Sequence, residues 1–232
     1  MEKETRERHH ERRFREIRRR QLRIRRLIVC GVVAFLMFLL GVVSGWTLRG
    51  CTIRKPVELS SIQAPAWIEQ QFISINPYSR PGTKLAAVNG VVVHYVGNPG
   101  TTAQQNRDYF QGLKNQSGSN TTSVSSHFIV GMDGEIIQCI PVDEKAFASN
   151  QRNADTIAIE CCHPEADGVF TEATYESLVK LTAWLCKELD LTPKEVIRHY
   201  DVTGKNCPKA FVEDEDAWKQ FQKDVKKAMR RN

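Results

Sequence analysis

The distribution of apolar residues along the chain predicts several strands with little exposed surface. Residues 88–95 and 155–162 form nearly continuous apolar runs bounded by turn residues, which is typical of buried strands. Residues 126–140 hold two β-rich runs joined at Asp133-Gly134, a dipeptide that favours a tight hairpin turn. We therefore expect two buried strands and one hairpin.

Apolar residues at helical spacing predict three helices between and after these strands. The clearest covers residues 171–189, where leucines recur on one stripe and acidic residues stand in the first turn. Residues 102–113, capped by Thr101 or Thr102, and residues 213–229 are the other two. Strands separated by helices, plus one hairpin, predict an α/β fold with a mixed central β-sheet flanked by helices.

An uncharged segment precedes this region. Residues 27–48 contain no charged side chain and are rich in Leu, Val and Phe. A bilayer core of roughly 30 Å needs about 20 apolar residues in a helix, so the segment predicts one transmembrane helix. Residues 1–26 carry twelve Lys and Arg against five Glu, which favours a cytoplasmic N-terminus. We expect a single-pass plasma-membrane protein whose C-terminal part lies outside the cytoplasm.

Two other uses of the apolar segment compete with an uncleaved anchor. A cleaved signal peptide has an apolar region of about 7–15 residues, and this segment is longer. A lipid anchor at Cys51 would need a lipobox, and Arg49 within Leu48-Arg-Gly-Cys51 disfavours one. We therefore favour a signal-anchor helix that is retained.

The positive charge of the chain is confined to its N-terminal region. The whole sequence has a net charge of +6, yet residues 56–232 hold 18 Lys and Arg against 22 Asp and Glu. Basic clusters attract nucleic-acid phosphates, but a basic arm beside anionic lipids explains this distribution more simply. We expect the membrane as a partner and no nucleic acid.

These features divide the chain into four parts. Residues 1–26 form a basic cytoplasmic arm, residues 27–48 the transmembrane helix, and residues 49–64 a linker. Residues 65–232 are enough for one core and too few for two comfortable domains. We expect this last part to be a single catalytic domain that acts as a monomer.

Seven cysteines are an odd number, so they cannot all pair within one chain. An exported domain favours disulfide bonds, and one or two bridges are compatible with the sequence, as is a fully reduced set. The cysteines available for such bridges are Cys139, Cys161, Cys162 and Cys186.

Candidate chemistry centres on residues 198–209. This run contains His199 and Cys207, with Lys205 two residues before the cysteine, and His94 closes an apolar run elsewhere. Two imidazoles and one thiolate suit zinc, and three protein ligands leave a fourth position for water. The donor set predicts a zinc hydrolase, and the competing interpretation is a core histidine with an unrelated buried cysteine.

Four stretches follow one another in a specific order: Val91-Val-Val-His-Tyr95, Ser126-His-Phe-Ile-Val130, Thr156-Ile-Ala-Ile-Glu160 and His199 to Cys207. In this order they resemble the zinc-dependent N-acetylmuramoyl-L-alanine amidases of the amidase-2 type, a family that includes the peptidoglycan recognition proteins. The resemblance covers residues 65–210, and residues 76–82 look like the Gram-positive and phage members. It implies an enzyme that cleaves the amide between N-acetylmuramic acid and L-alanine in peptidoglycan.

The resemblance also implies a role for each matching residue. His94, His199 and Cys207 correspond to zinc ligands, and zinc would activate a water and polarise the scissile carbonyl. Glu160 would take the proton of that water and pass it to the leaving amine, while Lys205 would stabilise the oxyanion. A carboxylate beside a cation and a metal should stay ionised. Strand alternation independently predicts that the side chain of Glu160 lies opposite its apolar neighbours.

One position departs from the family pattern. Phage and animal members often carry a catalytic tyrosine where this chain has Ser126. We assign Ser126 and Asn98 to substrate binding. His127 would then face away from the cleft and serve a structural role, and His163 is expected to be a loop residue rather than a ligand.

A binding protein is the main rival to an enzyme. Some relatives keep the fold, lose a ligand and only bind peptidoglycan, whereas this chain keeps all five site residues implied by the resemblance. An amidase for soluble muropeptides is a third possibility, and the predicted export disfavours it.

Overall fold

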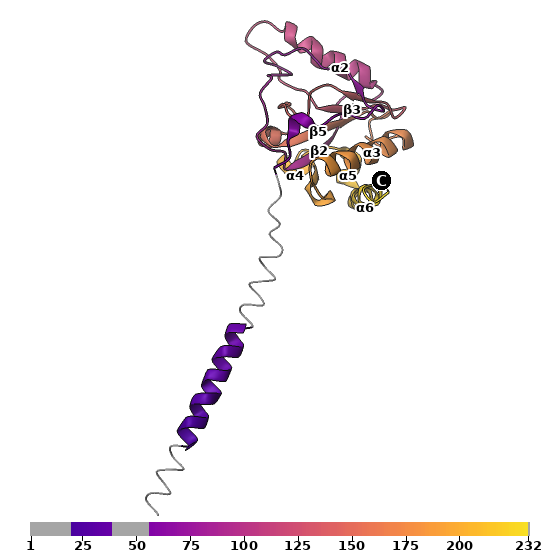
Figure 1. The fold of residues 1–232 in the computed structure, drawn as a ribbon. Helices are drawn as coiled ribbons and strands as arrows, with labels where there is room; N and C mark the ends of the chain where they lie inside the picture. Colours follow the sequence, from indigo (N-terminus) through magenta and orange to yellow (C-terminus); the bar gives the residue numbers. More distant parts are fainter. Residues whose placement is uncertain (1–19, 39–55, 232) are drawn as a thin grey trace, which may run out of the picture. The chain divides into compact units, whose positions relative to one another are not determined.

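The computed structural model describes residues 20–38 and 56–231, in two compact units that divide between Arg54 and Lys55. In the first unit, residues 20–38 form a helix with exposed side chains, drawn in indigo in Figure 1. Among the described residues, no helix is both long enough and apolar enough to cross a membrane. Residues 39–48 of the predicted span lie outside the described residues. Residues 1–19 of the basic arm and residues 49–55 of the linker also lie outside them.

The second unit is built on one mixed sheet, as predicted. Within residues 56–231 the sheet has six strands in the order β1-β4-β3-β5-β2-β6. Only β3 and β4 pair antiparallel, through the predicted hairpin, and every other pairing is parallel. The strands are β1 (Glu69–Gln70), β2 (Gly90–Tyr95), β3 (Phe128–Val130), β4 (Ile136–Gln138), β5 (Thr156–Cys161) and β6 (Val196–Arg198).

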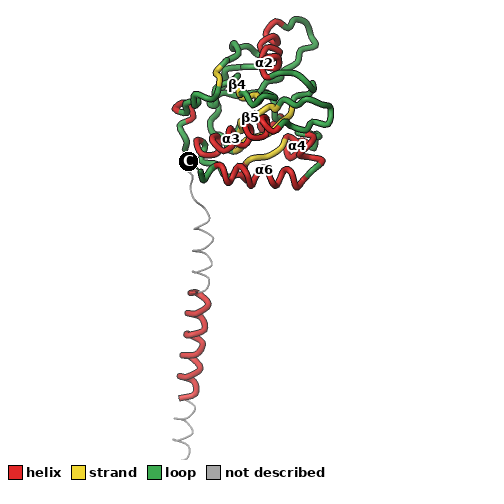
Figure 2. The backbone as a smooth tube through the Cα atoms, turned by 90° about the vertical axis from the view of Figure 1, so that its right-hand side faces the viewer, coloured by secondary structure: helices red, strands yellow, loops and turns green. Residues whose placement is uncertain are grey.

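Helices cover both faces of this sheet. Figures 1 and 2 show α2 on one side, with α3 and α6 together on the other. The helices are α2 (Ala103–Gly112), α3 (Glu172–Glu188), α4 (His199–Thr203), α5 (Lys209–Glu213) and α6 (Glu215–Ala228). Short 3-10 turns occur at η1 (Leu59–Ser61), η2 (Leu113–Asn115), η3 (Asn150–Ala154) and η4 (Pro193–Glu195).

Alternating side chains of the central strands divide the core into two layers. Val91 and Val93 of β2 pack with Ile157 and Ile159 of β5 in the cluster that includes α3 and α6. Ile129 of β3 packs on the opposite face, in the cluster that includes α2. Strands covered on both faces carry nearly continuous apolar sequence, which is why residues 88–95 and 155–162 could be recognised.

The predicted helices are confirmed, with ends that differ by one or two residues. Thr102 caps α2 by accepting from the Gln105 backbone, and the Gln105 side chain accepts from the Thr102 backbone in return. Thr171 caps α3 by accepting from the Thr174 backbone. Such caps satisfy backbone N–H groups that the first turn leaves unpaired, and so fix where each helix begins.

Part of the predicted linker belongs to the folded domain. Leu59 is only 7% exposed and lies in the main core, with Val57, Ile62 and Ala64 packed against that cluster. The predicted boundary at residue 64 is therefore too late. This short segment lacks a clear hydrophobic period, so its apolar residues give no signal in the sequence.

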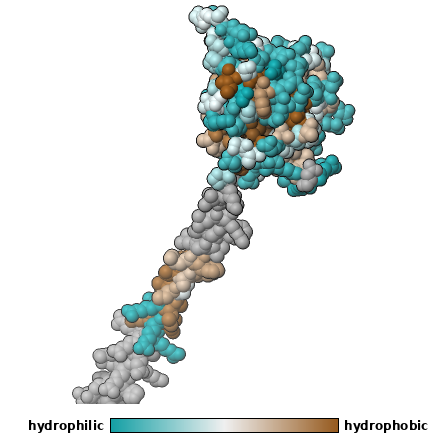
Figure 3. All heavy atoms as spheres, turned by 45° about the horizontal axis from the view of Figure 1, so that its top comes forward, coloured by the Kyte–Doolittle hydropathy of each residue, from teal (hydrophilic) through white to brown (hydrophobic). Residues whose placement is uncertain are grey.

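The surface of the second unit is mostly hydrophilic in the view of Figure 3, with scattered apolar residues between polar ones. Phe72, Ile75 and Tyr109 are among the exposed large apolar side chains. Scattered apolar residues of this kind are normal on soluble domains and identify no binding surface by themselves.

Candidate metal centre

Three neighbouring strands deliver the main candidate residues to one edge of the sheet. In the parallel register of β2 and β5, His94 lies directly beside Glu160. On the other side of β2, Val93 pairs with Arg198, the last residue of β6. His199 follows immediately as the first residue of α4. Residues distant in sequence therefore meet at the carboxyl ends of β5, β2 and β6, the usual place for sites in parallel sheets.

A tight return of the chain brings Cys207 to the same place. Gly204 ends α4 in the left-handed conformation, with a φ of 77° that favours glycine. Tyr200 N then donates to Cys207 O over 2.9 Å, and the Cys207 sulfur accepts from the Tyr95 backbone N–H. The sulfur is thereby tied to the end of β2, next to His94.

The three candidate ligand atoms converge. His94 Nδ1 lies 3.1 Å from His199 Nδ1 and 3.9 Å from Cys207 Sγ. All three atoms lie within 4.8 Å of one another, and the three side chains are buried. The structure thus brings together the residues that the sequence predicted as one donor set.

The electrostatics of the two histidines suit metal ligands. Burial, followed by the charges of His199 and Lys205, holds the pKa of His94 well below its ordinary value. Burial and the charge of Lys205 lower the pKa of His199 in the same way. Both imidazoles are therefore neutral at pH 7, and a neutral imidazole has the lone pair that a metal requires. Burial raises the pKa of the Cys207 thiol to about 12, so the thiol must lose its proton to become a ligand.

The arrangement fits zinc. Tetrahedral zinc with bonds of about 2.0–2.3 Å holds its ligand atoms roughly 3.3–3.8 Å apart. The measured separations of 3.1 and 3.9 Å from His94 Nδ1 are close to this range. Histidine nitrogen and cysteine sulfur are both ligands that zinc takes, and three protein ligands leave a fourth position open, as in catalytic zinc sites.

Glu160 is half-buried beside this cluster, on the strand face shared with His94. Its Oε2 is buried and, among the described residues, has no hydrogen-bond partner. Burial raises the pKa of this carboxyl to about 8, against the opposing charge of Lys205. The charge of Lys205 alone is thus not enough to keep this carboxyl ionised, and the expectation that a cation and a metal together keep it ionised stays a prediction. Burial destabilises the charged carboxylate more than the positive charge of the exposed Lys205 stabilises it.

Lys205 is exposed, at the turn between α4 and Cys207. Its charge lowers the pKa of His94, Glu160 and His199. An ammonium that acts on all three groups lies within electrostatic reach of the cluster. Its predicted role as an oxyanion-stabilising group is compatible with this position.

The two residues predicted to bind substrate lie in different environments. Ser126 has no exposed surface, and its hydroxyl donates to Phe128 O over 2.9 Å. This geometry does not support a substrate contact for Ser126. Asn98 is exposed in the turn after β2, where its carbonyl accepts from the Thr101 hydroxyl. Its role in substrate binding stays a prediction.

The remaining domain histidines are structural, as expected. His127 is buried, its Nε2 donates to Glu144 O, and its Nδ1 accepts from Ala158 N. Burial lowers the pKa of His127 to about 4. His163 is also buried, with both ring nitrogens next to backbone carbonyls. Neither ring belongs to the group of convergent metal-ligand atoms found in the described residues.

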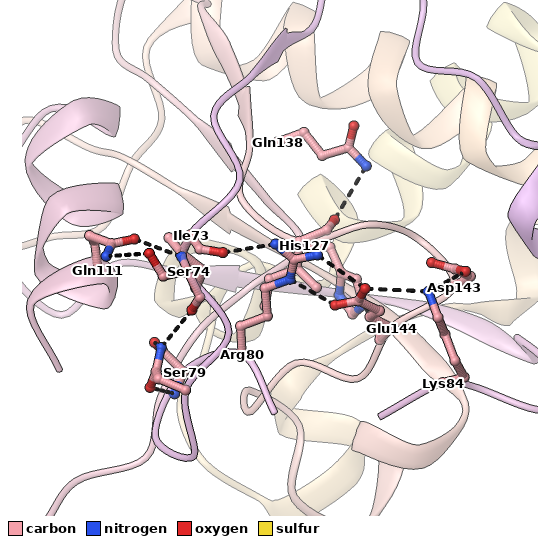
Figure 4. Close-up of polar contacts among 12 residues, drawn as sticks. Ile73, Ser74, Ser79, Arg80, Lys84, Gln111, His127, Gln138, Asp143 and Glu144 are labelled. Carbon is pink, nitrogen blue, oxygen red and sulfur yellow. Dashed lines mark hydrogen bonds and ion pairs between the residues drawn. The ribbon is translucent and has the colours of Figure 1, made fainter. Parts of the chain in front are cut away.

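A buried ion pair lies beside His127 and was not anticipated from the sequence. Figure 4 shows Arg80 between Ile73 and Glu144, with Lys84 beyond the same carboxylate. Arg80 Nε and a second guanidinium nitrogen contact the two carboxylate oxygens of Glu144 at 2.7 and 3.0 Å, and Nη1 donates to Ile73 O. The pair fastens the segment before β2 to the loop after β4.

Three further residues of the site were missed by sequence reasoning. Ser149 and Asn150 contact the outer ring nitrogens of the two histidines. Arg198, just before His199, pairs with Asp201 and Glu215 and donates to Phe211 O. Apart from the Arg198–Asp201 pair, whose residues are three positions apart, these contacts join segments distant in sequence, so no local motif indicates them. The one feature of the sequence that indicated this loop was the pair of turn-forming residues Ser149-Asn150.

The other cysteines of the domain are free thiols. Burial raises the pKa of each, and a buried neutral thiol behaves as a small apolar side chain. The set consists of Cys139, Cys161, Cys162 and Cys186. Of the two alternatives compatible with the sequence, the reduced set is the one in the structure.

Comparison with known proteins gives the same family for sequence and fold. The sequence model of the Amidase_2 family, described as N-acetylmuramoyl-L-alanine amidase, matches residues 84–210. The N-acetylmuramoyl-L-alanine amidase CwlL of Bacillus licheniformis is 34% identical over 174 residues, which cover 68% of this chain and 46% of CwlL. BlyA of Bacillus subtilis (strain 168), of the same description, is 34% identical over 179 residues, or 68% of this chain and 46% of BlyA. The chain thus spans about half the length of these curated relatives.

Solved structures agree with this result. A mutant endolysin from Bacillus subtilis has a TM-score of 0.57 and 27% identity, covering 68% of this chain and 97% of that one. The catalytic domain of XlyA has a TM-score of 0.55 and 25% identity, covering 68% and 98% respectively. The matched family region contains every residue of the convergent cluster. The chain belongs to the Amidase_2 family of N-acetylmuramoyl-L-alanine amidases.

Proposed function

We propose that this protein is a zinc-dependent amidase that hydrolyses the bond between N-acetylmuramic acid and L-alanine in cell-wall peptidoglycan. The observation that carries the proposal is the convergence of His94, His199 and Cys207 beside the half-buried carboxylate of Glu160. The curated relatives named above carry the same activity in their names. A peptidoglycan-binding protein would have no need of a neutral three-ligand cluster next to an unpartnered acid.

The residues of the cluster divide into a metal-holding set and a proton-moving group. His94, His199 and Cys207 hold the zinc, and bound zinc supplies a Lewis acid for the scissile carbonyl and the attacking water. Tyr95 N–H donates to the Cys207 sulfur and stabilises its thiolate form. His94 lies at the end of β2, His199 follows β6, and Cys207 lies between α4 and α5, so three separate segments of the folded chain assemble the site.

Glu160 acts as the general base and then as the general acid. Its unpartnered Oε2 takes a proton from the attacking water and returns it to the nitrogen of the leaving L-alanine. Nearby positive charge, from the metal and from Lys205, favours the ionised form that begins the cycle.

Lys205 stabilises the negative oxygen that develops on the attacked carbonyl. Its exposed side chain is free to approach bound substrate, and its charge already acts on the other site residues. A donor in this role typically contributes about 2.7–4 kcal/mol to lowering the barrier.

The reaction product tests the proposal directly. Zinc-loaded protein incubated with purified peptidoglycan should release new L-alanine amino termini, detected by end-group labelling. New reducing sugar ends would refute the bond assignment. Binding to peptidoglycan without any release, at a zinc content of about one per chain, would instead favour a non-catalytic binding protein.

We further propose that residues 27–48 anchor the protein in the plasma membrane, with its N-terminus cytoplasmic and the catalytic domain outside. The support is the run of uncharged residues after a basic arm. Extraction from membranes by detergent, but not by high salt or alkaline carbonate, is the expected behaviour. Release by salt alone would contradict an integral anchor.

A further inference from the structure

We propose that Ser149 and Asn150 are positioning residues that fix the two histidine rings so that both Nδ1 atoms face the metal. This inference rests on the proposed zinc site, and it assigns a role to the loop between β4 and β5. Neither residue is among the convergent ligand atoms. Each instead contacts the nitrogen on the far side of one ring.

Ser149 holds the ring of His94. Ser149 Oγ lies 3.0 Å from His94 Nε2, and both residues are only 1% exposed. A neutral imidazole has one N–H and one lone pair, so a hydroxyl that accepts from Nε2–H leaves the lone pair on Nδ1. That Nδ1 is the atom directed at His199 and Cys207.

Asn150 holds the ring of His199. Asn150 Oδ1 lies 3.2 Å from His199 Nε2. A carbonyl oxygen can only accept, so Nε2 carries the hydrogen and Nδ1 keeps the lone pair. The Asn150 contact thus sets the tautomer of His199, and the Ser149 hydroxyl, in its accepting role, holds His94 in the same tautomer; metal-binding histidines commonly have such partners.

The backbone of this loop is held in an unusual conformation. Asn150 has a φ of 52°, in the left-handed region that few residues other than glycine and asparagine adopt. Asn153 Oδ1 accepts from both Ala148 N and Ser149 N, at 2.9 and 2.5 Å, and so stabilises the turn. Gln151 Nε2 also donates to Val202 O, which ties the loop to α4. Backbone strain held by surrounding contacts is a feature of sites that demand accurate placement.

The test measures zinc affinity of the full-length protein in detergent, by competition with a chromophoric chelator. Asn150→Gly removes the carbonyl and tolerates the positive φ, whereas Asn150→Asp keeps an oxygen acceptor. Ser149→Ala removes the hydroxyl. Asp190→Gly is the matched control, because Asp190 also has a positive φ of 51° but lies after α3, away from the site.

We expect Asn150→Gly and Ser149→Ala to weaken zinc binding by about 10–100-fold. Asn150→Asp should restore affinity to within a few-fold of wild type, and Asp190→Gly should not change it. The visible spectrum of the cobalt-substituted protein should shift in Asn150→Gly and should stay unchanged in Asp190→Gly. Metal-free melting temperatures of those two variants should remain similar, which separates ring positioning from folding.

Several results would overturn the inference. We would abandon the inference if Asn150→Gly and Ser149→Ala bound zinc as tightly as Asp190→Gly. That result would show that neither contact positions a ligand. Equal weakening in Asn150→Gly and Asn150→Asp would exclude the acceptor role of the side chain. If wild type itself bound no zinc, the proposed metal site would fail, and that result is distinct from an unchanged affinity in the variants.

Discussion

Individual residues of the site are recognisable in the sequence by type, but their ionisation depends on the fold. His94, His199 and Cys207 are predicted as one donor set from their residue types, and the resemblance to the amidase family implies the role of Glu160. The raised pKa of Glu160 was not predicted, because the cost of burying a charge depends on neighbours that only the folded chain supplies. The environment of Ser126 likewise could not be predicted, because only the folded chain shows that its hydroxyl donates a hydrogen bond to Phe128 O.

Glu160→Gln tests the proposed proton carrier. The amide keeps the size of the side chain and cannot take a proton, so kcat should fall by about 10²–10⁴-fold. Zinc content should stay near the wild-type value, because Glu160 is not among the convergent ligand atoms. Kinetics on peptidoglycan fragments, with metal analysis of the same samples, check both expectations. An active Glu160→Gln variant would remove Glu160 from the mechanism.

The buried His127 predicts a dependence of stability on pH. Its pKa is about 4 when folded, against an ordinary value of 6.5, so between these values the unfolded chain binds more protons. Stability is therefore fully present above about pH 6.5 and is lost as the pH falls towards 4, by about 3 kcal/mol from this residue. NMR titration of the His127 ring should show the neutral form down to about pH 4.5. A midpoint near 6.5 would contradict the buried environment.

At the scale of elements, the register of three strands creates the site. His94 and Glu160 are partners in β2 and β5, and His199 continues β6 on the other side of β2. Apolar runs revealed two of these strands in the sequence. The order of strands in the sheet could not be derived from them, because it depends on tertiary packing. The pair Glu69–Gln70 was missed altogether, since two polar residues carry no period.

The ion pair between Arg80 and Glu144 is predicted to stabilise the domain. Arg80→Met leaves a nearly buried carboxylate without its bidentate partner, and Lys84 contacts only one of its oxygens. We expect the free energy of unfolding to fall by about 3 kcal/mol in urea denaturation. Lys219→Met, which breaks a more exposed pair with Asp216, is the control and should change it by about 0.5 kcal/mol or less. Equal effects would show that the buried pair has no special weight.

The segment before the sheet gives a second test at this scale. Leu59 is buried in the main core, so Leu59→Ala should destabilise the domain by about 2–4 kcal/mol. The control is Ser60→Ala, because Ser60 is the next residue in the chain and its side chain is exposed. If Leu59→Ala left the stability of the domain unchanged, the prediction that residues 49–64 are only a linker would be favoured again.

At the scale of the whole molecule, the sequence allowed the fold class, the order of motifs and the family to be predicted. It did not reveal the supports around the site, such as Ser149, Asn150 and the Arg198 network, because these contacts join distant segments. The predicted anchor depends on sequence alone, and part of it lies outside the described residues. The division into two compact units is compatible with a catalytic domain that follows a separate N-terminal element.

The most direct test of the account is the zinc content of purified full-length protein, measured for wild type beside Cys207→Ser. Wild type should hold about one zinc per chain, lose it together with amidase activity on chelation, and regain both when zinc returns. Cys207→Ser should hold far less zinc and release little L-alanine terminus. Full activity in metal-depleted wild type, or zinc retained undiminished in Cys207→Ser, would contradict the central claim.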